Sequence, residues 1–156
     1  MLKINNLTTE NLAEGCITDN PQPRFSFKLQ SDKAETSLKS ATISVNGWTT
    51  ETSRQIFVPY AGDSLEPFTS YTVKVEALDN HGERAYAETT FQTGKLDQAW
   101  KAKWISDPTY TFKEKKSSPG PLTFRKKITV EKEVRKAWIA STAMGIYDLY
   151  WNDKKI

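Results

Sequence analysis

Hydrophobic and polar residues alternate most regularly between residues 71 and 77 of this 156-residue chain. The apolar positions of this stretch are Tyr71, Val73, Val75 and Ala77, with polar residues between them. A period of two predicts a β-strand with one buried and one solvated face. Just before it, Leu65 is placed to fill a core and Pro67 stiffens the approach. Tyr71 combines an apolar ring with a hydroxyl that can bond to nearby backbone, which is typical of the tyrosine corner of a β-sandwich.

Weaker patterns predict strands before this central one. The first residues carry Leu2, Ile4 and Leu7 between polar positions. Residues 24–29 predict a strand with Phe25, Phe27 and Leu29 on one face. The aromatic side chains of this strand are suited to pack against Tyr71 in a sandwich core. Residues 30–40 are polar and predict a loop. Residues 41–45 alternate again and lead into Asn46-Gly47, a strong hairpin signal because both positions of the tight turn need a positive φ.

Two more segments complete the first half of the chain. Residues 55–60 predict a short strand, which Pro59 places at a sheet edge. Residues 80–82 predict a turn, after which residues 83–93 return as a strand. The core positions expected in that strand are Tyr86 and Phe91. About seven short strands in about 95 residues are typical of an immunoglobulin-like sandwich.

The pattern changes after residue 94. Residues 94–98 are predicted to link two domains, and residues 107–121 to form a loop, because they hold few apolar residues. Strands are predicted over residues 122–130, 134–140 and 146–151, the last turning at Asn152-Asp153. The predicted fold class is all-β, with an immunoglobulin or fibronectin III-like β-sandwich in residues 1–95 and a truncated second β-sandwich in residues 96–156.

The strands predicted after residue 122 lack a second sheet that would cover their apolar side chains. We interpret the chain as a fragment that stops inside its second domain, one or two residues into a return strand. An open sheet with Tyr147, Leu149 and Trp151 on one face favours association. We therefore expect copies of the chain to self-associate through residues 122–156.

Composition places the protein among folded chains. Aromatic residues make up 12% and charged residues 26% of the sequence, unlike a disordered tail. No run approaches the roughly 18 apolar residues of a membrane span, and the first residues lack the apolar segment of a signal peptide. The single cysteine cannot form an internal disulfide. We therefore expect a cytoplasmic protein without a membrane partner.

The formal net charge of +3 combines two parts of opposite sign. Residues 1–98 carry 9 Lys and Arg against 13 Asp and Glu, whereas residues 99–156 carry 13 against 6. Such a change of sign supports a domain boundary. The basic excess also raises the question of a nucleic-acid face, but it lacks a stacking motif. A solvated basic surface is the better interpretation, and no nucleic-acid partner is predicted.

The residues with the strongest chemistry do not combine into a site. His81, the one histidine, has no second ligand at metal-binding spacing and no nucleophile beside it. Cys16 stands among loop residues and is best explained as a buried, unreactive thiol. Glu131 and Glu133 suggest the carboxylate pair of a glycosidase, but the cations around them favour a solvated hairpin loop.

Tryptophans are the remaining candidates, because aromatic faces suit sugar rings. The five are Trp48, Trp100, Trp104, Trp138 and Trp151. Packing in the core and between domains explains them at least as well. No catalytic, metal-binding or cofactor-binding residue is therefore predicted, and no cofactor.

Five motifs stand out for their order and spacing. They are GCITDNPQPRFSF at residues 15–27, VPYAG at 58–62 with TSY at 69–71, DNHG at 79–82, FQTG at 91–94 followed by WKAKWI at 100–105, and GIYDLYWNDKKI at 145–156. Together they resemble the N-terminal region of bacterial α-L-rhamnosidases of glycoside hydrolase family 78. The resemblance extends along most of the chain.

This resemblance implies a multidomain enzyme that removes terminal α-L-rhamnose from glycosides. In that family a fibronectin III-like domain precedes a jelly-roll domain, and a helical barrel much later holds the acid and base carboxylates, which have no matching positions here. The chain would be a non-catalytic scaffold whose partner is the rest of the parent glycosidase, with rhamnosides bound by the whole enzyme. Carbohydrate contact by the chain itself is left open. The alternative is a free-standing fibronectin III-like module that binds other proteins.

Overall fold

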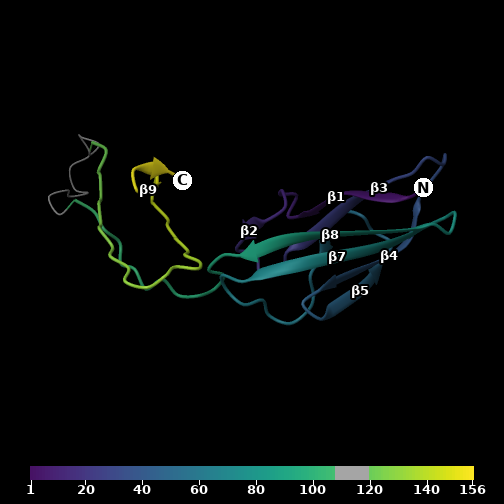
Figure 1. Cartoon of the computed structure of the whole chain (residues 1–156), viewed down its shortest axis with the longest axis horizontal. Helices are drawn as coiled ribbons and strands as arrows, with labels where there is room; N and C mark the ends of the chain where they lie inside the picture. The colour runs from purple at the N-terminus through teal and green to yellow at the C-terminus, as the bar shows by residue number, and fades with distance from the viewer. Residues whose placement is uncertain (108–119) are drawn as a thin grey trace. The chain divides into compact units, whose positions relative to one another are not determined.

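A computed structural model of the chain describes residues 1–107 and 120–156 (Figure 1). Contacts group the chain into two compact units, residues 1–98 with 140–156, and residues 99–139. All regular elements in the described residues are strands, so the predicted all-β class is confirmed. In the described parts, no helix has the length and apolar character needed to cross a membrane. Most of the loop predicted at residues 107–121 lies outside the described residues.

Residues 1–98 form a sandwich of two sheets (Figure 1). Its strands are β1 Lys3–Thr9, β2 Cys16–Thr18, β3 Arg24–Gln30, β4 Leu38–Val45, β5 Trp48–Thr52, β6 Val58–Pro59, β7 Ser70–Asp79 and β8 Arg84–Thr93. One sheet has the order β1-β3-β6 and the other the order β2-β8-β7-β4-β5. Strand β2 runs parallel to β8, and the remaining pairs in both sheets are antiparallel. The immunoglobulin-like sandwich is therefore confirmed.

The strand with the strictest alternation, β7, is the middle strand of the five-stranded sheet. Its odd-numbered residues from Tyr71 to Ala77 are buried and the even-numbered residues between them are exposed, as predicted. Phe25 and Phe27 of the other sheet belong to the same buried cluster. The Phe91 ring joins the two sheets, because its centroid lies 6.1 Å from that of Phe25 and 5.5 Å from that of Tyr71.

The tyrosine corner is also confirmed. The hydroxyl oxygen of Tyr71 accepts a hydrogen bond from the backbone N–H of Glu66 at 2.7 Å. The hydroxyl of Thr93 donates to the carbonyl of Glu66 at 2.6 Å. Leu65, next to it, is buried in the core. The loop that leads into β7 is thus attached to the sandwich through both backbone groups of Glu66, its N–H and its carbonyl.

The predicted turns and the edge strand are present, with shifted boundaries. Asn46 and Gly47 have φ angles of 49° and 81° and close the hairpin of β4 and β5. Strand β4 begins at Leu38, inside the segment predicted as a loop. Strand β6 lies at a sheet edge as predicted, but it is limited to two residues. Phe57 has a φ of 51°, which is incompatible with the extended backbone of a strand.

Tyr86 was predicted to lie in the core, and this is wrong. Its side chain is 58% exposed. Tyr86 lies five residues before Phe91, and an odd separation on a regular strand places two side chains on opposite faces. In the observed register Phe91 lies beside buried Tyr71, and Tyr86 lies beside Glu76 on the solvated face.

The segment predicted as a linker begins within the sandwich. The backbone N–H of Gly94 donates to the carbonyl of Thr18 at 2.9 Å, and the N–H of Leu96 donates to a carboxylate oxygen of Asp19 at 2.8 Å. Leu96 also packs against the core. These bonds hold at least residues 94–96 against the first domain. The exact division of the chain into domains stays a prediction.

Residues 120–156 contain one two-stranded hairpin, β9 Tyr150–Trp151 and β10 Lys154–Lys155. Its turn residues Asn152 and Asp153 have φ angles of 49° and 62°, so the predicted turn is confirmed. The strands predicted over residues 122–130 and 134–140 are wrong, and the one over residues 146–151 shrinks to two residues. A strand needs a partner for its backbone hydrogen bonds, and the described residues provide none for these segments.

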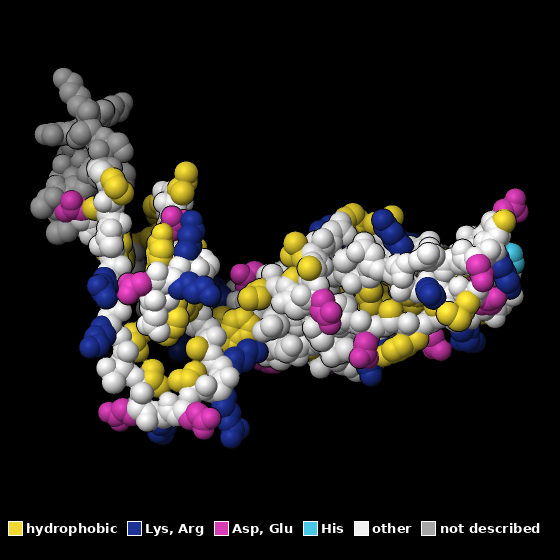
Figure 2. Space-filling view, turned by 45° about the horizontal axis from the view of Figure 1, so that its top comes forward, with side chains coloured by type: hydrophobic (Ala, Val, Ile, Leu, Met, Phe, Trp, Pro, Cys, Tyr) yellow, Lys and Arg dark blue, Asp and Glu magenta, His cyan; other side chains and the backbone are white. Residues whose placement is uncertain are grey.

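Apolar side chains in these unpaired segments remain at the surface. Phe124 is 55%, Ile128 59% and Val130 58% exposed. In the part of the molecule that carries residues 99–156, Figure 2 shows hydrophobic side chains beside Lys and Arg side chains. The alternating pattern that predicted strands is therefore real, but its apolar positions are not covered.

Candidate functional site

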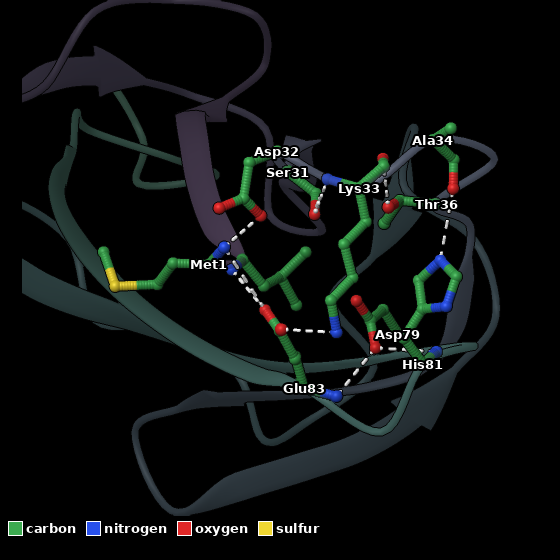
Figure 3. A network of polar contacts seen from close by, with 10 residues as sticks. Met1, Ser31, Asp32, Lys33, Ala34, Thr36, Asp79, His81 and Glu83 are labelled. Atoms are coloured by element: carbon green, nitrogen blue, oxygen red, sulfur yellow. Dashed lines mark hydrogen bonds and ion pairs between the residues drawn. The ribbon is translucent and has the colours of Figure 1, made fainter.

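A polar cluster of the sandwich joins its N-terminus, the loop between β3 and β4, and the turn between β7 and β8 (Figure 3). At its centre Asp79 is fully buried. One carboxylate oxygen of Asp79 accepts hydrogen bonds from the backbone N–H groups of His81 at 2.9 Å and of Glu83 at 2.7 Å. The carboxylate therefore fixes the turn that Gly82 completes with a φ of 82°.

Glu83 connects the other members of the cluster (Figure 3). One of its carboxylate oxygens lies 2.7 Å from the ammonium group of Lys33, and the other accepts from the backbone N–H of Leu2 at 2.7 Å. The amine of Met1 pairs with Asp32 and lies 3.7 Å from Glu83. The hydrogen bond from Lys33 lowers the pKa of Glu83. A carboxylate held ionised and already paired is unsuited to donate a proton, so the cluster acts as a structural connection.

The structure accounts for His81 within this cluster. Its ring is exposed, and Nε2 lies 3.3 Å from the carbonyl oxygen of Ala34 in the β3–β4 loop. Among the described residues, no group of three or more His, Cys, Asp and Glu side chains is arranged to hold a metal ion.

Cys16 and the paired glutamates are not brought together with these residues. The Cys16 thiol is half-buried rather than buried, and its sulfur lies 3.7 Å from the carbonyl of Thr9. Burial raises the pKa of this thiol, which keeps it neutral and poorly nucleophilic. Glu131 and Glu133 are both exposed, in a segment without strand structure.

Only one of the five tryptophans belongs to the sandwich core. Trp48 packs against it, with its ring 5.0 Å from that of Tyr60 in an edge-to-face arrangement. The Trp138 ring lies 4.6 Å from the ammonium group of Lys136. Trp100, Trp104 and Trp151 are between 48% and 64% exposed. Core packing therefore explains Trp48, and the structure assigns no sugar contact to the others.

A groove on the three-stranded sheet is a second candidate, and the sequence patterns did not reveal it. Its volume is about 360 Å³, and its lining comes from β1, the turn after β1, β3, and the segment before β6. The lining residues are Asn6, Thr8, Asn11, Ser26, Phe27, Lys28, Gln55, Ile56 and Phe57. Gln55, Ile56 and Phe57 were expected in a regular strand, but they lie outside β6. Asn6 of β1 and Asn11 of the turn after it were the available signal.

The two-sheet topology, the tyrosine corner and the Phe25–Phe91–Tyr71 core define the first part of the chain as an immunoglobulin-like β-sandwich domain. Residues 4–97, more than half of the chain, match the family model described as "Rha78A-like, N-terminal immunoglobulin domain". The chain belongs to this family, as the resemblance of its motifs had indicated.

Individual relatives agree with this assignment. The chain is 32% identical over 126 residues to an alpha-L-rhamnosidase of Formosa agariphila, and the match covers 68% of this chain and 13% of that protein. The crystal structure of Streptomyces avermitilis alpha-L-rhamnosidase complexed with L-rhamnose is 25% identical, with a TM-score of 0.62, covering 69% of this chain and 12% of that one. The Dictyoglumus thermophilum alpha-L-rhamnosidase is 26% identical with a TM-score of 0.63, covering 69% and 14%. The chain therefore spans a small part of the length of the proteins it matches.

Proposed function

We propose that the chain is the N-terminal, non-catalytic part of a larger glycosidase that removes terminal α-L-rhamnose from glycosides. The observation that carries this proposal is the match of residues 4–97 to an N-terminal domain of rhamnosidase type. The relatives support it, because the chain aligns with only 12–14% of each of the rhamnosidases described above. The acid and base carboxylates of such an enzyme lie in the remaining part.

Within that enzyme the chain serves as a scaffold. Residues 1–95 form the immunoglobulin-like domain, and residues 96–156 begin the jelly-roll-like domain that follows. Large exposed apolar side chains normally mark a surface that another element covers. The exposed side chains of Phe124, Ile128 and Val130 therefore pack against further strands of the parent protein. The cytoplasmic compartment stays a prediction.

In the absence of those strands, residues 122–156 mediate self-association of the isolated chain. Sedimentation velocity at about 50 μM compares the whole chain with a protein of residues 1–97; a contact with a Kd of about 1 μM leaves most chains paired at that concentration. The expected result is a dimer or larger species for the whole chain and a monomer for residues 1–97. Monomers in both samples would contradict self-association, and a dimer of residues 1–97 would move the contact to the sandwich.

An activity assay tests the central proposal. The purified chain is expected not to hydrolyse an aryl α-L-rhamnoside, whereas the whole parent protein hydrolyses it under the same conditions. Turnover by the chain above a heat-inactivated sample would contradict its non-catalytic role, and loss of that turnover in a Glu131→Ala, Glu133→Ala variant would place the missed site at this pair. A parent protein without rhamnosidase activity would contradict the proposed function and favour the alternative, in which the fibronectin III-like domain binds other proteins.

A further inference from the structure

The groove on the three-stranded sheet is built from irregular backbone. Asn6 has a φ of 52° and lies where the register of β1 against β3 shifts. Asn11, in the turn after β1, has a φ of 57°, and Phe57, before β6, has a φ of 51°. This conformation is unfavourable for a bulky side chain such as phenylalanine, and strained backbone is concentrated at ligand-binding sites. Asparagine adopts this conformation readily, so of these three residues Phe57 is the one whose backbone is strained.

The wall that contains Phe57 is held in place by neighbouring residues. The backbone N–H of Phe57 donates to the hydroxyl of Ser26 at 3.1 Å. The guanidinium group of Arg24 lies 4.6 Å from the centre of the Phe57 ring, and its Nη2 pairs with a carboxylate oxygen of Glu10 at 2.6 Å. A wall fixed before binding lowers the entropy cost of holding a ligand.

The polar lining offers hydrogen-bond donors and acceptors together. Each carboxamide can donate and accept, and the groove has three of them, on Asn6, Asn11 and Gln55. In the described parts of the chain, the Asn6 and Asn11 carboxamides make no hydrogen bond. Gln55 uses its oxygen to accept from the backbone N–H of Leu29 at 3.3 Å, which leaves its NH₂ group available. Apolar surface comes from Phe57 and from Ile56, which is 62% exposed.

The charge of the lining restricts the class of ligand. Lys28 is the one charged residue among the described residues that line the groove. A strongly anionic ligand needs more cations, and a cation needs a carboxylate that this lining lacks. A purely apolar ligand would bury the carboxamides without partners, which is costly. A neutral sugar fits, because its hydroxyls donate and accept while its C–H groups contact apolar side chains.

We propose that this groove binds a neutral sugar and that the immunoglobulin-like domain is a carbohydrate-binding domain. A groove of about 360 Å³ lies within the range of small-ligand sites, which is about 300–1,000 Å³. The proposal rests on the proposed function, because a sugar-binding accessory domain serves an enzyme that acts on glycosides. It adds a ligand and a site to a domain otherwise assigned a scaffold role.

Nuclear magnetic resonance titration of the whole ¹⁵N-labelled chain tests whether the groove binds a neutral sugar. A panel of neutral monosaccharides that includes L-rhamnose is added to about 50 mM, which detects dissociation constants in the millimolar range typical of weak single-site binding. At least one sugar is expected to cause saturable shifts at the backbone amides of residues 6–11, 26–28 and 55–57. Asn6→Gly and Asn11→Gly remove a carboxamide while glycine keeps the left-handed backbone, so each is expected to weaken binding about tenfold without unfolding the domain.

Asn5→Ala is the matched control, because Asn5 precedes Asn6 on β1, bonds to Gln30 and does not line the groove. It is expected to bind like the unchanged chain, with melting temperatures confirming that all variants are folded. Absence of saturable shifts with every sugar, shifts confined to another surface, or unchanged binding in both glycine variants would each overturn the proposal and leave the family membership intact. Failure of the proposed function would appear separately, as a parent protein without rhamnosidase activity. Binding of a sugar other than rhamnose supports the groove.

Discussion

The tyrosine corner provides the clearest test of the fold. Tyr71→Phe removes one hydroxyl and keeps the ring that stacks on Phe91 at 5.5 Å. The change leaves the backbone N–H of Glu66 without the oxygen that it contacts at 2.7 Å, while Thr93 still holds the carbonyl side of the same residue. Because Tyr71 is only 8% exposed, water has limited access to the vacated position.

A buried donor that loses its partner costs about 1–3 kcal/mol. Glu66 itself is exposed, so some hydration of its N–H group is available, and we expect the lower part of that range, about 1–2 kcal/mol. For a domain of this size each kcal/mol corresponds to about 4–8 °C in melting temperature. The whole chain carrying Tyr71→Phe is therefore expected to melt about 4–16 °C below the unchanged chain, as followed by circular dichroism.

Tyr86→Phe is the matched control on the adjacent strand. Its hydroxyl donates to Glu88 at 2.7 Å on the solvated face, where water replaces the lost bond. We expect a change within about 0.5 kcal/mol. If both variants melted at the same temperature, the Tyr71 hydroxyl would contribute nothing to stability, and the reasoning about the corner would be refuted.

Three further predictions concern the polar contacts and close packing of the sandwich. Asp79→Ala is expected to lower the free energy of unfolding, measured in urea, by about 1–3 kcal/mol, because the N–H groups of His81 and Glu83 lose their acceptor. Asp79→Asn keeps an acceptor and is expected to lower it less. Equal losses of stability in the two variants would contradict this role of Asp79. The hydrogen bond from Arg24 lowers the pKa of Glu10 in the folded protein. The ionised pair therefore stabilises the fold at every pH above the pKa that Glu10 has in the unfolded chain. This stabilisation is lost as the pH falls through the lower pKa of the folded protein. The difference in unfolding free energy between the unchanged chain and Glu10→Gln is thus expected to be largest near neutral pH and to vanish in acid. Glu14→Gln, at an exposed position, is the control. A difference that does not depend on pH would contradict the prediction. Gly94→Ala would place a Cβ 2.5 Å from a carboxylate oxygen of Asp19 and is expected to lower the free energy of unfolding by about 1–3 kcal/mol. Gly120→Ala is the control, because a Cβ at that position meets no atom within 4 Å, and it is expected to leave the melting temperature unchanged. Equal melting temperatures of the two variants would contradict the close packing at Gly94.

The sequence alone determined the features that depend on neighbouring residues. Strict alternation predicted which side chains of β7 are buried, because successive residues of a strand point to opposite faces. Asn46-Gly47 predicted its hairpin, because few other residue pairs accept two positive φ angles. The spacing of Leu65, Pro67 and Tyr71 predicted the tyrosine corner, because all three residues lie within one short stretch of the chain.

The tertiary structure decided the features that depend on residues far apart in the chain. Tyr86 faces solvent because the register of β7 against β8 assigns the buried face to Phe91 and its alternate neighbours. Residues 122–140 alternate as a strand would, yet no strand forms there because a β-strand takes its hydrogen bonds from a partner. The groove joins Asn6, Asn11 and Phe57, which no local pattern relates to one another. Local periodicity specifies which way a side chain points, and only the pairing of distant segments specifies what it meets there.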